Sequence, residues 1–182
     1  GLLVDITKIL TERKIDMISV NSRTSRQGMA TITMSFEVPE IEDEEPYQIG
    51  KAKIRKKGSD ITLVSYSKTM LTVLEPANQL EDAGISAEVI DLVTLSPWDK
   101  ETVLESVKKT GHLCICHEAV KQGGFGAEIA ATAAEEAFDS LKGPVLRLAA
   151  PFTPVPFAPS MENKVRVHVD DIVNAITKTL KG

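Results

Sequence analysis

The chain has 182 residues, of which 42% are hydrophobic and 26% are charged, and its formal net charge at pH 7 is -5. This length is enough for one good core with a small appendage. The acidic balance argues against a general nucleic-acid-binding protein, because neutralising phosphates needs a concentrated basic surface. No apolar run approaches the roughly 20 residues of a membrane-spanning helix, and the start of the chain lacks signal-peptide features, so we expect a cytoplasmic protein.

The first 38 residues have the pattern of a helix followed by two strands. Apolar residues recur at helical spacing over residues 2–13, and a strand is expected over residues 15–21. Residues 29–38 alternate strictly between apolar and polar side chains, which is typical of a half-buried strand. The turn residues at 25–28 lie between the two strands, so the pattern predicts a hairpin.

An acidic stretch separates this beginning from the rest of the chain. Five of the residues 40–45 are acidic, and prolines stand on both sides of them, so residues 39–48 are interpreted as a linker. Residues 51–57 then carry alternating charge and a basic pair, which favours an edge strand over a phosphate site.

The remainder of the chain alternates between strand and helix patterns. Short apolar runs stand at residues 61–66, 87–92, 113–116 and 145–149, separated by stretches of helical period. Such a succession favours a parallel sheet covered by helices on both faces.

The first helix of this region is expected over residues 68–83, with Gly84 as its end. Pro76 lies in its middle and removes a backbone hydrogen bond, at a cost of roughly 3 kcal/mol in a regular helix. A kink or a break is therefore expected at that position. The residues expected to face inward are Leu71, Leu74, Ala77 and Leu80.

Three more helices are expected further along the chain. The first of them has Ser96 as its N-cap, Pro97 in its first turn and Asp99 three residues on, and it ends at Gly111. An alanine-rich helix follows, and the final helix begins near Asp170.

His117 and Glu118 are the first candidates for chemistry, because they end a predicted central strand and ligands gather at the carboxyl ends of parallel strands. A neutral imidazole beside a carboxylate can act as a general base. A histidine at a strand end more often caps a loop or holds an interface. Both interpretations stay open.

A metal site is not predicted. Cys114 and Cys116 share one face of a strand whereas His117 points to the other, and a tetrahedral site needs convergent ligands. The two cysteines are interpreted as small buried hydrophobic residues.

Glycines and prolines mark two loops. Gly123, Gly124 and Gly126 precede a helix whose free backbone N–H groups can hold an anion, but close packing of strand against helix explains these glycines at least as well. Four prolines at 151, 154, 156 and 159 stiffen the loop after the last strong strand. A binding surface can use such a loop as a rigid rim, although we favour ordinary loop stiffening.

From about Glu44 to Gly182 the chain resembles the carboxyl-terminal, transketolase-like domain of the beta subunit of thiamine-diphosphate-dependent 2-oxo-acid dehydrogenases. Residues 45–51, 59–66, 89–97, 117–128 and 154–159 carry the similarity. The resemblance implies an α/β fold over residues 49–182, a three-layer α/β/α sandwich with a mostly parallel sheet of about five strands.

In that family, thiamine diphosphate and magnesium lie between the alpha subunit and the amino-terminal half of the beta subunit, regions not expected in this chain. The resemblance therefore implies a noncatalytic domain, in a fragment or a fusion, that joins subunits and helps to dock the lipoyl-carrying acyltransferase component. It implies no cofactor-binding residues here, and it makes His117 and Glu118 structural or interface residues. One departure is Lys142, which stands where relatives commonly offer an acidic side chain to a basic docking domain, so like charges would meet.

Residues 1–38 resemble a different family, the ACT domain at the carboxyl end of ppGpp synthetase/hydrolase proteins. Residues 1–10, 19–24 and 28–32 carry this similarity. The segment would supply one helix and two strands of a small α+β domain that has two helices and four strands. Gly1 and Asp5 fall where such domains often bind a small regulatory ligand. Three elements bury little surface, so the segment should need a partner.

Three functions follow from these observations. The preferred one is the noncatalytic assembly and docking domain, and the alternatives are a regulatory module built on the ACT-like segment and an enzyme with chemistry at His117 and Glu118. The open edge of the alternating strand and the alanine-rich helix both invite a partner, so a homodimer is expected.

Overall fold

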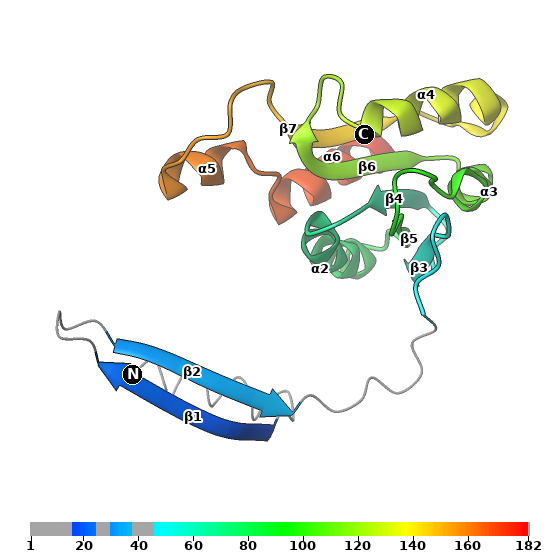
Figure 1. The fold of residues 1–182 in the computed structure, drawn as a ribbon. Coiled ribbons are helices and arrows are strands. Elements are labelled where there is room, and N and C mark those ends of the chain that lie inside the picture. The colour runs from blue at the N-terminus through cyan, green and yellow to red at the C-terminus, as the bar shows by residue number, and fades with distance from the viewer. Residues whose placement is uncertain (1–15, 25–29, 38–45, 182) are drawn as a thin grey trace. The chain divides into compact units, whose positions relative to one another are not determined.

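The structure, a computed structural model, describes residues 16–24, 30–37 and 46–181 (Figure 1). The chain divides into two compact units, residues 1–46 and residues 47–182. The helix expected over residues 2–13 and the acidic run at 40–45 lie outside the described residues. No helix in the described ranges is long and apolar enough to cross a membrane.

The first unit contains an antiparallel hairpin. Its strands are β1 (Asp16–Thr24) and β2 (Ala30–Glu37), paired from Asp16 opposite Glu37 to Thr24 opposite Ala30. The pairing shifts between Met17 and Ser19. This confirms the hairpin that the alternating pattern and the turn residues predicted.

The second unit is built on a five-stranded sheet in the order β3-β5-β4-β6-β7. Strand β3 lies at an edge and runs antiparallel to β5, whereas β5, β4, β6 and β7 pair in parallel. The strands are β3 (Lys53–Lys56), β4 (Ile61–Ser65), β5 (Ala87–Asp91), β6 (Leu113–Val120) and β7 (Leu146–Ala150). This confirms the mostly parallel sheet and the basic edge strand.

Helices cover both faces of this sheet (Figure 1). The helices are α2 (Thr69–Asp82), α3 (Lys100–Thr110), α4 (Gly126–Glu136), α5 (Pro159–Val165) and α6 (Val169–Lys181), with a short 3-10 helix at Phe138–Ser140. One core cluster joins the sheet to α2 and α6, and the other joins it to α3 and α4. Along β4, Ile61 and Leu63 enter the first cluster and Val64 enters the second, because successive strand residues point to opposite faces. The three-layer α/β/α architecture is thus confirmed.

Helix α2 corrects one detail of the sequence analysis, its buried face. It continues as a single helix through Pro76, so of the expected kink or break the break does not occur. Its buried face is formed by Met70, Val73, Ala77 and Leu80, whereas Leu71 is 77% exposed and Leu74 is also exposed. The predicted stripe repeated every three residues, and at about 100° per residue such a stripe drifts halfway around the helix over nine residues. The observed stripe alternates steps of three and four and stays on one face.

Helix α3 begins later than predicted, at Lys100, and its N-cap is Asp99 instead of Ser96. The Asp99 carboxylate accepts hydrogen bonds from the Thr102 backbone N–H at 3.2 Å and from the Ala52 backbone N–H at 3.0 Å. Burial acts to raise the pKa of Asp99, but these N–H donors outweigh it, and the pKa lies below its usual range. The cap therefore also ties the segment leading into β3 to the start of α3.

Candidate functional site

The sheet reverses its order between β4 and β6. The chain leaves β4 through α2 to β5 on one side, and then returns through α3 to β6 on the other side of β4. In open α/β sheets, ligands bind outside the carboxyl ends of the strands at such a switch point. The segments that follow β4 and end β6 are therefore where a site is expected.

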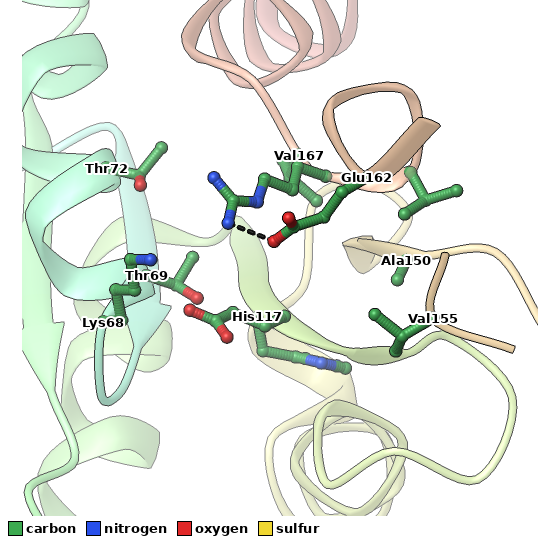
Figure 2. A pocket seen from close by; sticks show the side chains of 11 residues that line it. Lys68, Thr69, Thr72, His117, Ala150, Val155, Glu162 and Val167 are labelled. Atoms are coloured by element: carbon green, nitrogen blue, oxygen red, sulfur yellow. Dashed lines mark hydrogen bonds and ion pairs between the residues drawn. The ribbon is translucent and has the colours of Figure 1, made fainter. Parts of the chain in front are cut away.

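A cleft of about 170 Å³ lies at this point (Figure 2). Its walls come from the start of α2, from β6, from the end of β7 and the loop after it, and from α5 and the residues that follow. The lining residues are Lys68, Thr69, Thr72, His117, Glu118, Ala150, Val155, Glu162, Val165, Arg166 and Val167. The cleft thus combines charged and hydroxyl side chains with small apolar ones.

The start of α2 gives the cleft its polar wall. Lys68 is the N-cap residue but supplies no side-chain cap, and the first turn holds no acidic side chain. Thr69 is buried, and its Oγ1 has no hydrogen-bond partner among the described residues. Ser67, just before the helix, has a φ of 55°, and such backbone outliers cluster at ligand sites. On the opposite wall, Arg166 forms an ion pair with Glu162.

The imidazole of His117 is fully buried and is held between an aromatic ring and a glycine turn. The Tyr66 ring stacks on it, with the ring centroids 5.7 Å apart and the planes inclined by 15°. On the other side, a Cβ on Gly126 would lie 2.4 Å from Nε2 of His117, and one on Gly124 would lie 2.8 Å from Cε1. Gly126 is therefore required to make room for this ring, whereas a Cβ on Gly124 would first meet the carbonyl oxygen of Val120, at 2.3 Å.

Burial keeps the His117 imidazole neutral in this arrangement. Neither ring nitrogen has a hydrogen-bond partner within the part of the chain that the structure describes. Burial lowers the pKa of His117 below its usual value; the nearby Ala119 backbone opposes this shift, and the charge of Arg147 adds to it. Glu118 is exposed whereas His117 is buried, because neighbours on a strand point to opposite faces. The structure does not bring the two side chains together.

Aromatic side chains extend the packing around His117. The Phe125 ring meets Tyr66 edge to face at a centroid distance of 6.3 Å, and it meets Trp98 in the same manner at 5.9 Å. Burial raises the pKa of the Tyr66 hydroxyl. Sequence reasoning missed this cluster, since its members follow different strands and only their positions near strand ends gave a signal.

Of the remaining predicted site residues, Gly1 and Asp5 are outside the described residues, and Gly123 and Lys142 are not among the residues that line the cleft. Gly123 adopts a φ of 75° and has no atom within 4 Å of an added Cβ, so backbone conformation alone favours glycine there. Lys142 is exposed, and its aliphatic chain covers Gly111, where a Cβ would lie 2.7 Å from Cδ.

The cysteines behave as core residues. Cys114 and Cys116 are both buried, and burial raises the pKa of Cys116 to about 12 and that of Cys114 further still. At ordinary pH both are uncharged thiols, which are poor metal ligands and poor nucleophiles. In the described residues, no group of three His, Cys, Asp or Glu side chains is placed to hold a metal ion.

Comparison with known proteins gives a consistent result for the second unit. Residues 50–172 match the family described as transketolase, C-terminal domain. The pyruvate dehydrogenase E1 component subunit beta, mitochondrial, of Dictyostelium discoideum is 42% identical over 142 residues, which are 77% of this chain and 40% of that protein. The acetoin:2,6-dichlorophenolindophenol oxidoreductase subunit beta of Bacillus subtilis is 41% identical over 154 residues, which are 85% and 44% of the two chains. The chain thus spans less than half the length of these relatives.

A solved structure supports the same fold. It is described as a split gene transketolase, inactive beta4 tetramer, and it superposes with a TM-score of 0.66 at 30% sequence identity. The match covers 79% of this chain and 46% of that chain. The family match lies within the second unit, and none of these similarities supports the ACT-like interpretation of residues 1–38.

Proposed function

Because the chain belongs to the family of transketolase C-terminal domains, we propose that it is the noncatalytic assembly and docking domain of the beta subunit of a 2-oxo-acid dehydrogenase. The names of the similar proteins, among them pyruvate dehydrogenase and acetoin oxidoreductase beta subunits, support this assignment. In the whole complex, the partners would be the alpha subunit and the lipoyl-carrying acyltransferase component.

The observation that carries the proposal is an apolar, proline-stiffened segment at residues 151–161. Phe152, Val155, Phe157 and Met161 are exposed in it by 57% or more, and Phe157 is fully exposed. Prolines at 151, 154, 156 and 159 restrict the backbone, so little conformational entropy is lost when the segment is covered. Apolar side chains gathered on a rigid exposed segment are typical of a protein–protein interface.

We propose a second copy of this chain as the occupant of the segment 151–161. The similar solved structure is described as an inactive beta4 tetramer, which supports self-association of a related chain. A two-fold symmetric dimer would cover the segment on both copies at once. This assigns the expected homodimer to a particular surface.

The buried state of His117 supports a noncatalytic role. A side chain held between Tyr66 and the glycine turn is not exposed to a substrate, and it has no neighbouring carboxylate to act with. Its position is instead that of a packing residue at the switch point. The alternative of an enzyme working through His117 and Glu118 receives no support from this geometry.

Thiamine diphosphate and magnesium belong to the parent complex in this proposal. Magnesium bound to a diphosphate is held through oxygen ligands such as aspartate carboxylates. The described residues contain no group of three acidic or other metal-binding side chains placed to hold it. We assign the described residues no step of its chemistry.

The test of self-association is the mass in solution. The wild-type chain should scatter light as a dimer of about 40 kDa, twice its 19.8 kDa. Phe157→Asp should shift the population to monomer at the same concentration, because a carboxylate would then have to be desolvated in the interface. Leu71→Asp is the control, since Leu71 is also a large, mostly exposed apolar residue but lies on α2, outside the segment 151–161. A wild-type chain that stays monomeric at high concentration, or equal dissociation of both variants, would contradict the proposal.

A further inference from the structure

We propose that the cleft at the carboxyl ends of β4 and β6 binds a small monocarboxylate with a short, branched apolar body. Nothing in the assembly function requires this site, and the inference goes beyond it. It rests on the start of α2, on the unsatisfied hydroxyl of Thr69 and on the apolar wall opposite.

The start of α2 provides the site for the anionic head. A helix of 14 residues places about half a positive charge at its amino end. The Met70 and Leu71 N–H groups there already donate to the carbonyls of Ser67 and Lys68, so the helix dipole, and not these two N–H groups, would attract an anion. No acidic side chain in the first turn neutralises that end, and Lys68 adds a full positive charge beside it. Figure 2 shows Lys68, Thr69 and Thr72 on one wall of the cleft.

The second and independent observation is the side chain of Thr69. The residue is only 5% exposed, it lines the cleft, and its Oγ1 has no hydrogen-bond partner among the described residues. Buried hydroxyls are nearly always paired, because an unpaired one has lost its hydrogen bonds to water without replacement. A carboxylate oxygen bound at the start of α2 would accept a hydrogen bond from the Thr69 hydroxyl and so give this buried group a partner.

The opposite wall fixes the class of the ligand's body. Ala150, Val155, Val165 and Val167 present small apolar surfaces, and Figure 2 shows Ala150, Val155 and Val167 across the cleft from Thr69. The volume of about 170 Å³ lies below the roughly 300 Å³ of the smaller drug-sized sites. The occupant should therefore be a compact molecule with a few apolar carbons.

The charges and the apolar wall together favour a monocarboxylate. Lys68 and the α2 terminus attract an anion, while the carboxylate of Glu118 also lines the cleft and opposes it. Arg166 is engaged by Glu162, so it adds little net charge. Inorganic phosphate has no apolar body to place against Ala150, Val155 and Val167, so a monocarboxylate is the better match.

Nuclear magnetic resonance titration of the full chain tests this site with three molecules of one shape. Isobutyrate should give saturable shifts of the backbone amides of Thr69 and Thr72. Isobutyramide, which lacks the charge, and isobutylamine, which reverses it, should bind at least about tenfold more weakly. Inorganic phosphate should also bind more weakly than isobutyrate.

Matched variants tie the binding to named groups. Thr69→Val keeps the shape of the side chain and should weaken isobutyrate binding about tenfold, as should Lys68→Gln. Glu118→Gln should strengthen it, and Lys108→Gln, which changes an exposed lysine on α3, should leave it unchanged. The proposal is overturned by an absence of saturable shifts, by equal binding of isobutyramide or isobutylamine, by tighter binding of phosphate, or by an unchanged affinity in Thr69→Val. Val155 belongs both to the cleft and to the segment 151–161, so the titration is repeated on Phe157→Asp. Unchanged isobutyrate binding by that variant would separate a failure of the proposed assembly from a failure of this site.

Discussion

Replacing Gly126 with alanine should lower the free energy of unfolding, although alanine is normally the better helix former. The new Cβ would lie 2.4 Å from Nε2 and 2.6 Å from Cδ2 of His117, and 3.1 Å from Cγ2 of Ile115. Carbon atoms in good contact lie about 3.5 to 4.0 Å apart, so the overlap with the ring is about 1 Å. The ring cannot simply retreat, because Tyr66 stacks against it.

The expected magnitude is a net loss of about 2 kcal/mol. Overpacking a filled core costs about 1 to 3 kcal/mol, or more where the neighbour cannot move. Exchanging glycine for alanine in a helix gains up to about 1 kcal/mol, and less at its first position, which offsets part of that cost. The clash therefore outweighs the gain in helix propensity.

Tryptophan fluorescence during urea unfolding is a direct assay. The chain has one tryptophan, Trp98, and its ring meets Phe125 at 5.9 Å in the same aromatic cluster. The decisive comparison is made in a His117→Ala background, where the room left by the missing ring should reduce the cost of Gly126→Ala to about 0.5 kcal/mol or less. Gly123→Ala, which strains the backbone without a steric contact, should cost the same in both backgrounds.

The reasoning about this turn is refuted by either of two results. One is that Gly126→Ala unfolds at the same urea concentration as the wild type with an unchanged slope. The other is that its cost is the same whether or not the His117 ring is present. In both cases the glycine would not be making room for that ring.

Two further predictions concern buried titratable groups. Lys109→Met should lower the free energy of unfolding by about 2 kcal/mol, because it leaves the carboxylate of Glu88, whose side chain is 3% exposed, without its ion-pair partner. The control Lys108→Met should change the free energy of unfolding little. Equal losses in the two variants, measured by urea unfolding, would contradict the prediction. His117 has a lowered pKa in the folded state, so below about pH 6.5 the unfolded chain binds more protons and stability falls as the pH drops. His117→Phe should lose less stability than the wild type as the pH drops. The prediction is wrong if the urea midpoint falls by the same amount between about pH 7 and pH 5 in the wild type and in His117→Phe.

The features that could be predicted from the sequence are those set by local pattern. The alternation in residues 30–37 predicted a strand, and the short apolar runs predicted a parallel sheet covered on both faces, because side-chain period alone decides which face is apolar. Gly84 and Gly111 were predicted as helix ends, and both adopt the positive φ that favours glycine at those positions. The edge position of the basic strand β3 was likewise predicted from its charge pattern.

The features that the sequence could not decide depend on partners far along the chain. Asp99, and not Ser96, caps α3 because its carboxylate also binds the Ala52 backbone, 47 residues away. Packing against the sheet decides which face of α2 is buried, and Leu71 is not on that face. The periodicity of the sequence indicates neither the hydrogen bond between Asp99 and Ala52 nor the packing of α2 on the sheet.

The sequence by itself determined the class of fold, the order of its elements and the family, because local residue patterns and motifs indicate each of these. Only the tertiary structure decided what His117 does and where a ligand can bind. His117 meets Tyr66 and Gly126 because three separate segments converge, and the cleft is assembled from segments between residues 68 and 167. Convergence of distant segments depends on packing, which no single stretch of sequence specifies.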